Sequence, residues 1–187
     1  MNQIIKALLH QTISLTETEL DFIVSLFREI KLKKGEFFLN EGDACTEIAI
    51  VNYGLLRVFS LVEDQKISLF FSDEGQVVTS IGSFLSNEPS RFSIQAVIDV
   101  KLFVITKLNI ELVYSTIPNA HKLSFEVFES IARAFNYRIE QLLTIPPLEM
   151  YYHLMAKYPE LIKNVPVKDL ASFMNITPQH LSRLRKL

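Results

Sequence analysis

The spacing of apolar and polar residues changes twice along this 187-residue chain. Residues 1–30 have a helical spacing, and their apolar residues share one face of the expected helix: Leu20, Ile23, Val24 and Phe27. Thr16 followed by Glu19 predicts a capping box, because the hydroxyl and the carboxylate can each satisfy an amide group at the start of a helix. From about Lys31 to Thr106 the period falls to two, which is typical of strands with one buried face.

The central region consists of short runs rich in β-branched and aromatic residues. The expected strands are Glu36–Leu39, Glu47–Val51, Leu55–Ser60, Ile67–Phe71, Gln76–Ser80, Ser93–Ala96 and Lys101–Ile105. Turn sequences such as Glu41-Gly42-Asp43 separate them. Many short strands at fairly even spacing favour a sandwich or barrel over alternating strands and helices.

After Lys107 the helical period returns, and we expect one long helix from Pro118 to about Leu143. An apolar stripe follows it: Leu123, Val127, Phe128, Ile131, Phe135, Ile139 and Leu142. A stripe of about seven turns is longer than a small domain needs for its own core, so it predicts a homodimer contact. The residues expected at that contact are Val127, Ile131, Phe135, Ile139 and Leu142. The alternative is packing against the chain's own strands. Pro146-Pro147 ends the helix and predicts a hinge.

Residues 167–186 have the pattern of a helix-turn-helix. The first helix has one apolar face: Leu170, Ala171, Phe173 and Met174. Asn175 stands at the expected turn, because Asn adopts the left-handed conformation more readily than other residues with a side chain. Thr177 fits an N-cap, and Pro178 fits the first helical position, where its missing N–H costs nothing.

In the second helix Leu181 and Leu184 face inward, which leaves a polar and basic face for water or DNA: Gln179, His180, Ser182, Arg183, Arg185 and Lys186. Residues 146–187 hold six Lys or Arg against three Asp or Glu, a net charge of +3, although the whole chain carries −2. This local excess matters because non-specific DNA binding is largely phosphate neutralisation. The alternative interpretation is a structural helical hairpin with a solvated basic face.

Other chemistry is not indicated. The single cysteine, Cys45, allows neither an intrachain disulfide nor a cysteine-ligated iron–sulfur cluster. The four histidines are scattered without ligand spacing, so we expect no metal, no haem and no other cofactor. No catalytic constellation or phosphate-binding loop is present, which argues against an enzyme. No apolar run approaches the length of a membrane span, so we expect a cytoplasmic protein without a membrane partner.

The order of these elements resembles the cyclic-AMP receptor protein/fumarate–nitrate regulator (Crp/Fnr) family of bacterial transcription regulators. The residues that carry the resemblance are the turns Lys33–Phe37 and Asn40–Asp43, Gly54 after a hydrophobic strand, and the runs 165–174 and 177–186. The resemblance implies an α+β fold: an N-terminal double-stranded β-helix (a cyclic-nucleotide-binding-like jelly roll), a long dimerisation helix and a C-terminal winged helix-turn-helix. The implied domains are a β-roll sensor at 1–117, the dimerisation helix and hinge at 118–145, and the DNA-binding domain at 146–187.

Position within the family's recognition helix implies base contacts by Gln179 and Arg183, because Gln and Arg pair in bidentate fashion with adenine and guanine edges. His180 is a third candidate for a base contact. The resemblance implies phosphate contacts for three others: Ser182, Arg185 and Lys186.

The sequence departs from the family at the cyclic-nucleotide phosphate cassette. Thr79-Ser80 stands where members that bind the nucleotide carry Gly-Glu, and Ser90 stands at the position of their Arg. Arg91 comes one place late, which in a strand points to the opposite face. We therefore do not expect tight cyclic-AMP binding, because a buried phosphate without its partner is costly. The remaining ligand-binding candidates are Arg91, Ser80, Gly82 and Ser83, with an exposed pairing of Arg91 with an acidic neighbour as the alternative.

The leading hypothesis is a homodimeric regulator that binds double-stranded DNA and whose roll senses an unidentified small molecule. The runner-up is a sensory or scaffolding module that does not bind DNA, in which the helix-turn-helix is a protein-interaction hairpin. A third hypothesis retains cyclic-nucleotide binding through Arg91.

Overall fold

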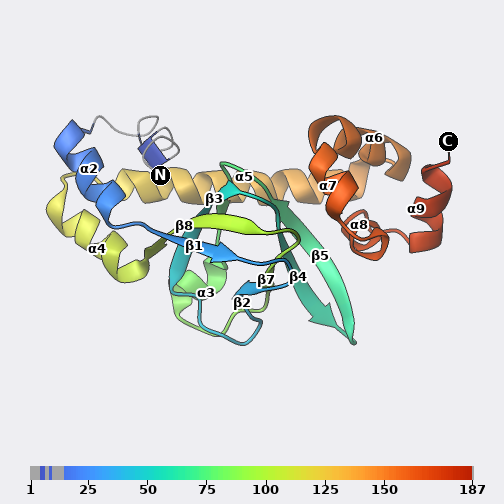
Figure 1. The fold of residues 1–187 in the computed structure, drawn as a ribbon, viewed down its shortest axis with the longest axis horizontal. Coiled ribbons are helices and arrows are strands. Elements are labelled where there is room, and N and C mark those ends of the chain that lie inside the picture. The colour runs from blue at the N-terminus through green and yellow to red at the C-terminus, as the bar shows by residue number, and fades with distance from the viewer. Residues whose placement is uncertain (1–4, 7–8, 10–14, 187) are drawn as a thin grey trace.

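The computed structural model describes residues 5, 6, 9 and 15–186. It contains a roll of two antiparallel four-stranded sheets, with helices alongside the roll and at its two ends (Figure 1). The first sheet has the order β1 (Arg28–Leu32), β8 (Val100–Thr106), β3 (Glu47–Tyr53) and β6 (Val77–Val78). The second has the order β2 (Phe37–Leu39), β7 (Ser93–Ala96), β4 (Leu56–Val62) and β5 (Gln65–Ser72). The jelly-roll part of the expected α+β fold is confirmed.

The core of the roll lies between the two sheets. Its fully buried side chains are Ala49, Val51, Leu56, Ile94, Leu102 and Val104. They come from strands of both sheets, as expected when alternate residues of packed sheets point inward. Gly54 joins β3 to β4 with a φ of +102°, and a Cβ there would lie 2.5 Å from the Asp99 carbonyl oxygen. Glycine is therefore required at this turn.

The N-terminal segment differs from the expectation of a helix up to residue 30. Helix α2 (Glu17–Ser25) ends earlier, and Arg28–Leu32 form β1, paired antiparallel with β8. Ile30 and Leu32 alternate with polar residues and pack on the roll core. The apolar contact that they make as a strand favours β1 over a continuation of the helix before it. The capping box is confirmed, because Thr16 and Glu19 exchange both hydrogen bonds. The part of the prediction at 1–4, 7–8 and 10–14 lies outside the described residues.

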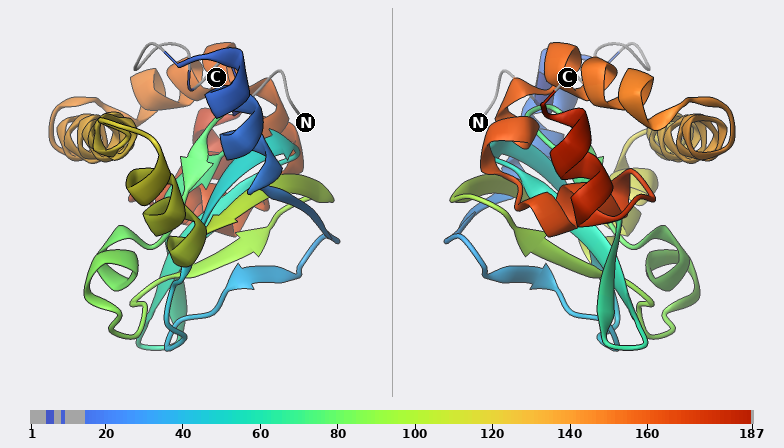
Figure 2. Two further views of the ribbon diagram at one scale, coloured as in Figure 1. Left: turned by 90° about the vertical axis from the view of Figure 1, so that its left-hand side faces the viewer. Right: turned by 90° about the vertical axis from the view of Figure 1, so that its right-hand side faces the viewer.

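Helix α5 (His121–Thr144) runs along the long axis of the molecule, from the side of α2 and α4 to the C-terminal helices (Figure 1). At one end it follows α4 (Lys107–Thr116), and Asn119, with a φ of 61°, forms the turn between them. Viewed along its axis, α5 lies to one side of the strands (Figure 2). All residues of α5 are described, and among them only Arg138 is buried.

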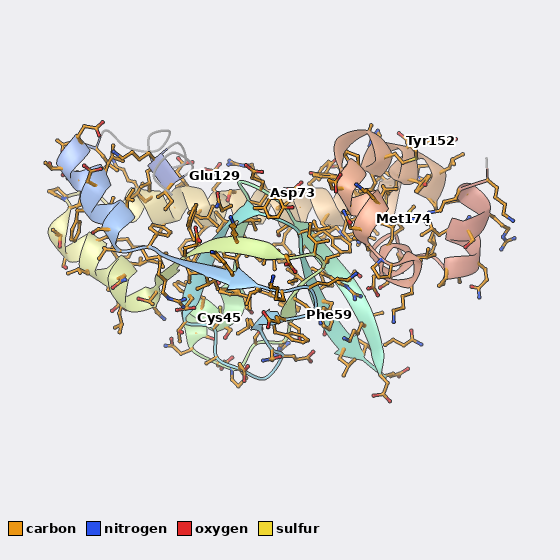
Figure 3. The ribbon with its side chains drawn as sticks, in the orientation of Figure 1. Cys45, Phe59, Asp73, Glu129, Tyr152 and Met174 are labelled. Atoms are coloured by element: carbon orange, nitrogen blue, oxygen red, sulfur yellow. The ribbon has the colours of Figure 1, made fainter. Side chains whose placement is uncertain are left out.

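Four helices follow α5 and gather at its far end (Figure 1). They are α6 (Pro147–Lys157), α7 (Pro159–Asn164), α8 (Val167–Phe173) and α9 (Pro178–Leu184). They share a core that includes Met150, Leu154, Leu161, Leu170, Met174 and Leu181, and Met174 lies among them in Figure 3. Within the described residues no strand follows β8, so the expected wing stays a prediction. A six-residue helix, α3 (Ile81–Ser86), escaped prediction because it is short and contains a glycine.

Candidate nucleic-acid interface and its contact with the roll

The turn between α8 and α9 has the local geometry that the sequence predicts. Asn175 has a φ of 53°, in the left-handed region, and the Ile176 amide donates to the Ala171 carbonyl at 3.0 Å. The Thr177 hydroxyl accepts from the His180 amide at 3.1 Å, and Pro178 occupies the first turn of α9. These contacts fix the angle at which α9 leaves α8, since the chain reverses over the four residues 174–177.

The side chains expected to contact DNA lie on the outer surface of α9. Gln179, Ser182, Arg183, Arg185 and Lys186 are exposed, and His180 is half-buried. Leu181 and Leu184 are buried on the opposite side of the helix. In Figure 1, α9 forms the end of the molecule farthest from the roll, where it is open to a large partner.

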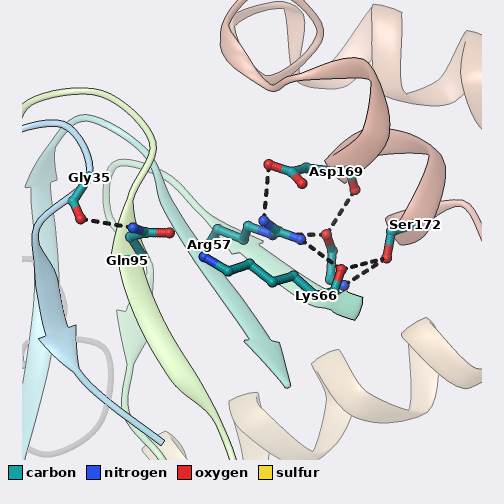
Figure 4. Close-up of polar contacts among 7 residues, drawn as sticks. Gly35, Arg57, Lys66, Gln95, Asp169 and Ser172 are labelled. Carbon is teal, nitrogen blue, oxygen red and sulfur yellow. Dashed lines mark hydrogen bonds and ion pairs between the residues drawn. The ribbon is translucent and has the colours of Figure 1, made fainter. Parts of the chain in front are cut away.

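Helix α8 is bound to the roll by a buried polar network on β4 and β5 (Figure 4). Arg57 Nη1 on β4 lies 3.0 Å from Asp169 Oδ2 on α8, and these side chains are 5% and 14% exposed. Arg57 Nε donates to the Ser68 hydroxyl at 2.9 Å. The Ser68 hydroxyl donates to the Asp169 carbonyl at 2.8 Å, and the Ser68 amide donates to the Ser172 hydroxyl at 3.0 Å. We call these four residues, Arg57, Ser68, Asp169 and Ser172, the β5–α8 network.

Burial and pairing act in opposite directions on Arg57. Burial lowers the pKa of its guanidinium below the usual value, whereas the nearby Asp169 carboxylate raises that pKa. Its Nη2 also donates to the Lys66 carbonyl at 3.0 Å, and its guanidinium lies 4.8 Å from the centroid of the Phe59 ring. The charge is thus held by an ion pair, a carbonyl and a ring, which is how a buried arginine is tolerated.

A second contact connects α5, β5 and α8. Arg138 Nε donates to the Leu69 carbonyl at 3.1 Å, and Nη2 donates to the Phe173 carbonyl. The guanidinium carbon of Arg138 lies 3.8 Å from the centroid of the Phe173 ring. The same ring packs edge-on against Phe71 of β5, with centroids 5.2 Å apart. Phe173 is therefore held between α5 and the roll.

The four expected ligand-binding residues do not form one charged site. Ser80 is buried, and its hydroxyl lies 2.8 Å from that of Ser90, the residue at the position of the family's arginine. Ser83 is also buried, and its hydroxyl accepts from the Cys45 amide at 2.8 Å. Gly82 and Arg91 are exposed. The hydroxyls at this place therefore satisfy one another and neighbouring backbone groups.

Two cavities lie between α5 and the rest of the chain. One of about 260 Å³ is lined mainly by apolar residues, including Phe27, Val77, Val113 and Phe128. The other, of about 450 Å³, lies between β5, α5 and the C-terminal helices, and its lining includes Asp73, Phe135, Arg138 and Phe173. Asp73 is labelled in Figure 3, close to α5. Sequence reasoning missed the second cavity, because its walls come from three regions far apart along the chain.

The five residues expected at a dimer contact divide into two groups. Val127, Ile131 and Phe135 line the cavities, and the Phe135 ring lies 4.6 Å from that of Phe70 on β5. Ile139 and Leu142 are 54% and 40% exposed. The chain's own roll thus contacts part of the predicted stripe.

Sequence reasoning also missed Arg57 and Arg138. A charged residue within an apolar run is a signal of burial, but its partner cannot be read from the sequence. The described residues contain no group of three or more side chains suited to hold a metal ion. No helix in the described part of the chain is long and apolar enough to cross a membrane.

Comparison with known proteins supports a common fold. Residues 29–116 match the family model described as the cyclic nucleotide-binding domain. The c-di-GMP-responsive global regulator CLP of Xanthomonas campestris has a similar structure, with a TM-score of 0.72 at 13% identity over 91% of this chain and 90% of that one. FixK2 of Bradyrhizobium japonicum gives a TM-score of 0.69 at 15% identity, covering 86% of this chain and 83% of that one.

A third similar structure comes from Eubacterium rectale and is ascribed to the Crp/Fnr family of transcriptional regulators. Its TM-score is 0.71 at 16% identity, and the match covers 92% of this chain and 82% of that one. No curated protein sequence matches the chain. The resemblance expected from the sequence is confirmed at the level of fold.

Proposed function

We propose that this chain, which carries a cyclic-nucleotide-binding domain and has the fold of Crp/Fnr regulators, is a homodimeric transcription regulator that reads DNA through α9. The observation that carries the proposal is the capped α8–turn–α9 unit, whose outer face presents Gln179 and Arg183 at the open end of the molecule. Gln and Arg at such positions pair with base edges in the major groove.

Dimerisation is supported by a second apolar face on α5. Phe125, Ile139 and Leu143 are 68%, 54% and 79% exposed, and Phe125, Ala132 and Ile139 recur every seven residues. Residues at this interval share one side of a helix and form the contact between paired helices. Large exposed apolar patches are rare on monomers. A second copy of the chain covers this face in the proposed dimer, so that two copies of α9 meet successive major grooves about 34 Å apart.

Regulation would pass through the β5–α8 network. Arg57 and Ser68 of the roll bind α8 directly, and α8 determines where α9 lies. A ligand that moves β5 therefore changes the direction of α9 without touching it. Such a ligand shifts the population of DNA-competent dimers by its difference in affinity for the two arrangements.

The test is selection from a random DNA library at low and moderate salt. We compare wild type with Arg183→Ala, and use Lys163→Ala on α7 as the control, because Lys163 is an exposed cation away from α9. We expect a palindrome that wild type and Lys163→Ala enrich and Arg183→Ala does not, with binding that weakens steeply as salt rises. Failure of wild type to enrich any motif, or equal enrichment by Arg183→Ala, overturns the proposal and favours an interaction hairpin.

A further inference from the structure

Arg138 of α5 is a buried arginine that has no anionic partner among the described residues. It is 8% exposed, and its Nε and Nη2 donate to the carbonyls of Leu69 and Phe173. Its Nη1 is buried and has no hydrogen-bond partner among the described residues. Burial lowers the pKa of the guanidinium to about 10, so the group stays charged at neutral pH. Buried charges in proteins are nearly always paired, because an unpaired donor on a charged group loses its hydration without replacement.

The contrast with Arg57 makes this arrangement unusual. Both arginines are buried and both contact α8, but Arg57 has the Asp169 carboxylate at 3.0 Å. No carboxylate contributes to the pKa of Arg138, for which burial is the one cause found in the described structure. Among the described residues, Arg57 thus has a counter-ion and Arg138 has none.

Arg138 also lines the larger cavity, whose volume is about 450 Å³. Aromatic and aliphatic side chains make up most of its walls: Leu69, Phe70, Val78, Phe92, Ile131 and Phe135. Asp73 also belongs to the lining and is itself engaged in an interaction, which leaves Arg138 as the cation of the cavity. A single cation in a largely apolar cavity suits a ligand with one negative charge and an apolar body. A phosphate dianion is less suitable, because one guanidinium neutralises only one of its two negative charges.

We propose that this cavity binds an amphipathic monocarboxylate, with the carboxylate received by Arg138. Arginine presents parallel donors that match the two oxygens of a carboxylate, and Nη1 is free to provide one of them. The cavity borders the hydroxyl cluster of Ser80 and Ser90, since its lining includes Thr79, Ile81 and Phe92, but Arg138 itself lies on α5, outside that cluster. Its role in regulation, though not the binding itself, rests on the proposed function.

Binding at Arg138 is coupled to α8 by the contacts already made. Nη1 is buried by surrounding side chains, and the Phe173 ring is stacked on the guanidinium. A carboxylate therefore reaches Nη1 only when the side chains packed around Arg138 move. Phe173 lies on α8, and its carbonyl accepts from Nη2 of the same arginine. The ligand therefore competes with α8 for Arg138, and occupancy of the cavity weakens the attachment of α8 to the roll.

The experiment measures binding to the full chain in the absence of DNA, so its outcome does not depend on the proposed function. The probes are 4-phenylbutyrate and its neutral isostere 4-phenylbutyramide, titrated calorimetrically at low salt. We expect the carboxylate to bind at least ~10-fold more tightly than the amide, as one charged hydrogen bond provides. Arg138→Met should abolish this preference. Arg91→Ala, which removes an exposed arginine of the roll, should retain it.

Three results would overturn the proposal: no binding of 4-phenylbutyrate at millimolar concentration, equal affinity for acid and amide, or an unchanged preference in Arg138→Met. Loss of the preference in Arg91→Ala would move the site to the roll surface and also overturn it. The comparison of acid with amide is made on wild type, so it decides the question even if Arg138→Met fails to fold. If the chain binds the carboxylate but not DNA, the binding site is supported and only the proposed function is refuted.

Discussion

Replacing Asp169 by alanine should release α8 from the roll while leaving both parts folded. The substitution removes the counter-ion of Arg57, whose side chain is 5% exposed. The roll keeps a core of its own around Leu102, whereas the core around Leu170 also includes Leu55 of the roll. Separation of α8 from the roll returns the guanidinium to water and exposes the apolar contact at Leu55.

The magnitude follows from the geometry. Two unit charges 3.0 Å apart attract by about 5 kcal/mol at an effective dielectric constant of ~20, and desolvation cancels part of this energy. Removing one partner of a buried pair costs about 3–5 kcal/mol, mainly because the other charge is left buried. At about 3 kcal/mol the equilibrium between attached and separated α8 shifts by roughly a hundredfold toward separation.

The assay is hydrogen exchange at the Ser68 amide. β5 is an edge strand of its sheet, and this amide donates to the Ser172 hydroxyl of α8 at 3.0 Å. Its exchange should therefore report separation of α8, and should accelerate by about a hundredfold in Asp169→Ala. Lys168→Ala, at the exposed neighbouring position, is the control. The double variant Arg57→Met/Asp169→Leu should restore protection, because an apolar pair can replace a buried ion pair. An exchange rate within twofold of wild type in Asp169→Ala would refute this reasoning.

Three further predictions concern local geometry. Gly54→Ala should lower stability by about 2–4 kcal/mol in urea unfolding, because its Cβ would meet the Asp99 carbonyl at 2.5 Å; Gly35→Ala, which shares a positive φ but has open space, should cost less. Thr177→Ala should destabilise the C-terminal helices by ~1 kcal/mol through loss of the N-cap, as measured by thermal unfolding, with Thr177→Ser close to wild type. Hydrogen bonds from the Thr16 amide and hydroxyl lower the pKa of Glu19 below its ordinary value of 4.5. Their stabilisation is therefore present above about that pH and is lost as pH falls through the folded pKa; Glu19→Gln should show a weaker loss of stability in acid, and equal pH profiles would contradict this.

The features that sequence predicted well are those set by neighbouring residues. Asn175, Thr177 and Pro178 specify a turn and a cap within four positions, and the observed helix begins as they require. The strands of the roll followed from alternation, because each strand buries one face. The prediction of a helix is wrong at residues 28–30, which begin strand β1, because a five-residue strand directly after a helix contains too little alternation to establish a new period.

The features that sequence could not provide depend on contacts between distant segments. Ser68 and Asp169 are 101 residues apart, and nothing in either segment indicates the other. The larger cavity likewise has walls from the roll, α5 and α8. The family resemblance places the candidate ligand residues around Ser80, whereas Arg138, whose Nη1 has no hydrogen-bond partner in the described structure, lies on a different element, α5. Such sites form where distant segments pack together, so the pattern of neighbouring residues in the sequence does not predict them.

The double attachment of the C-terminal helices to the rest of the molecule has a consequence for orientational entropy. These helices are joined to α5 by the chain at Ile145 and are held a second time by noncovalent contacts, those of the β5–α8 network and those of Phe173 with Arg138 and Phe71. With both attachments intact, α9 samples a narrow range of directions, whereas with the covalent one alone it samples many. In a dimer that already holds one half-site, the effective concentration of the second α9 at the other half-site depends on this range. A ligand could therefore alter DNA affinity by changing how many orientations are available, even if the average position of α9 stayed the same.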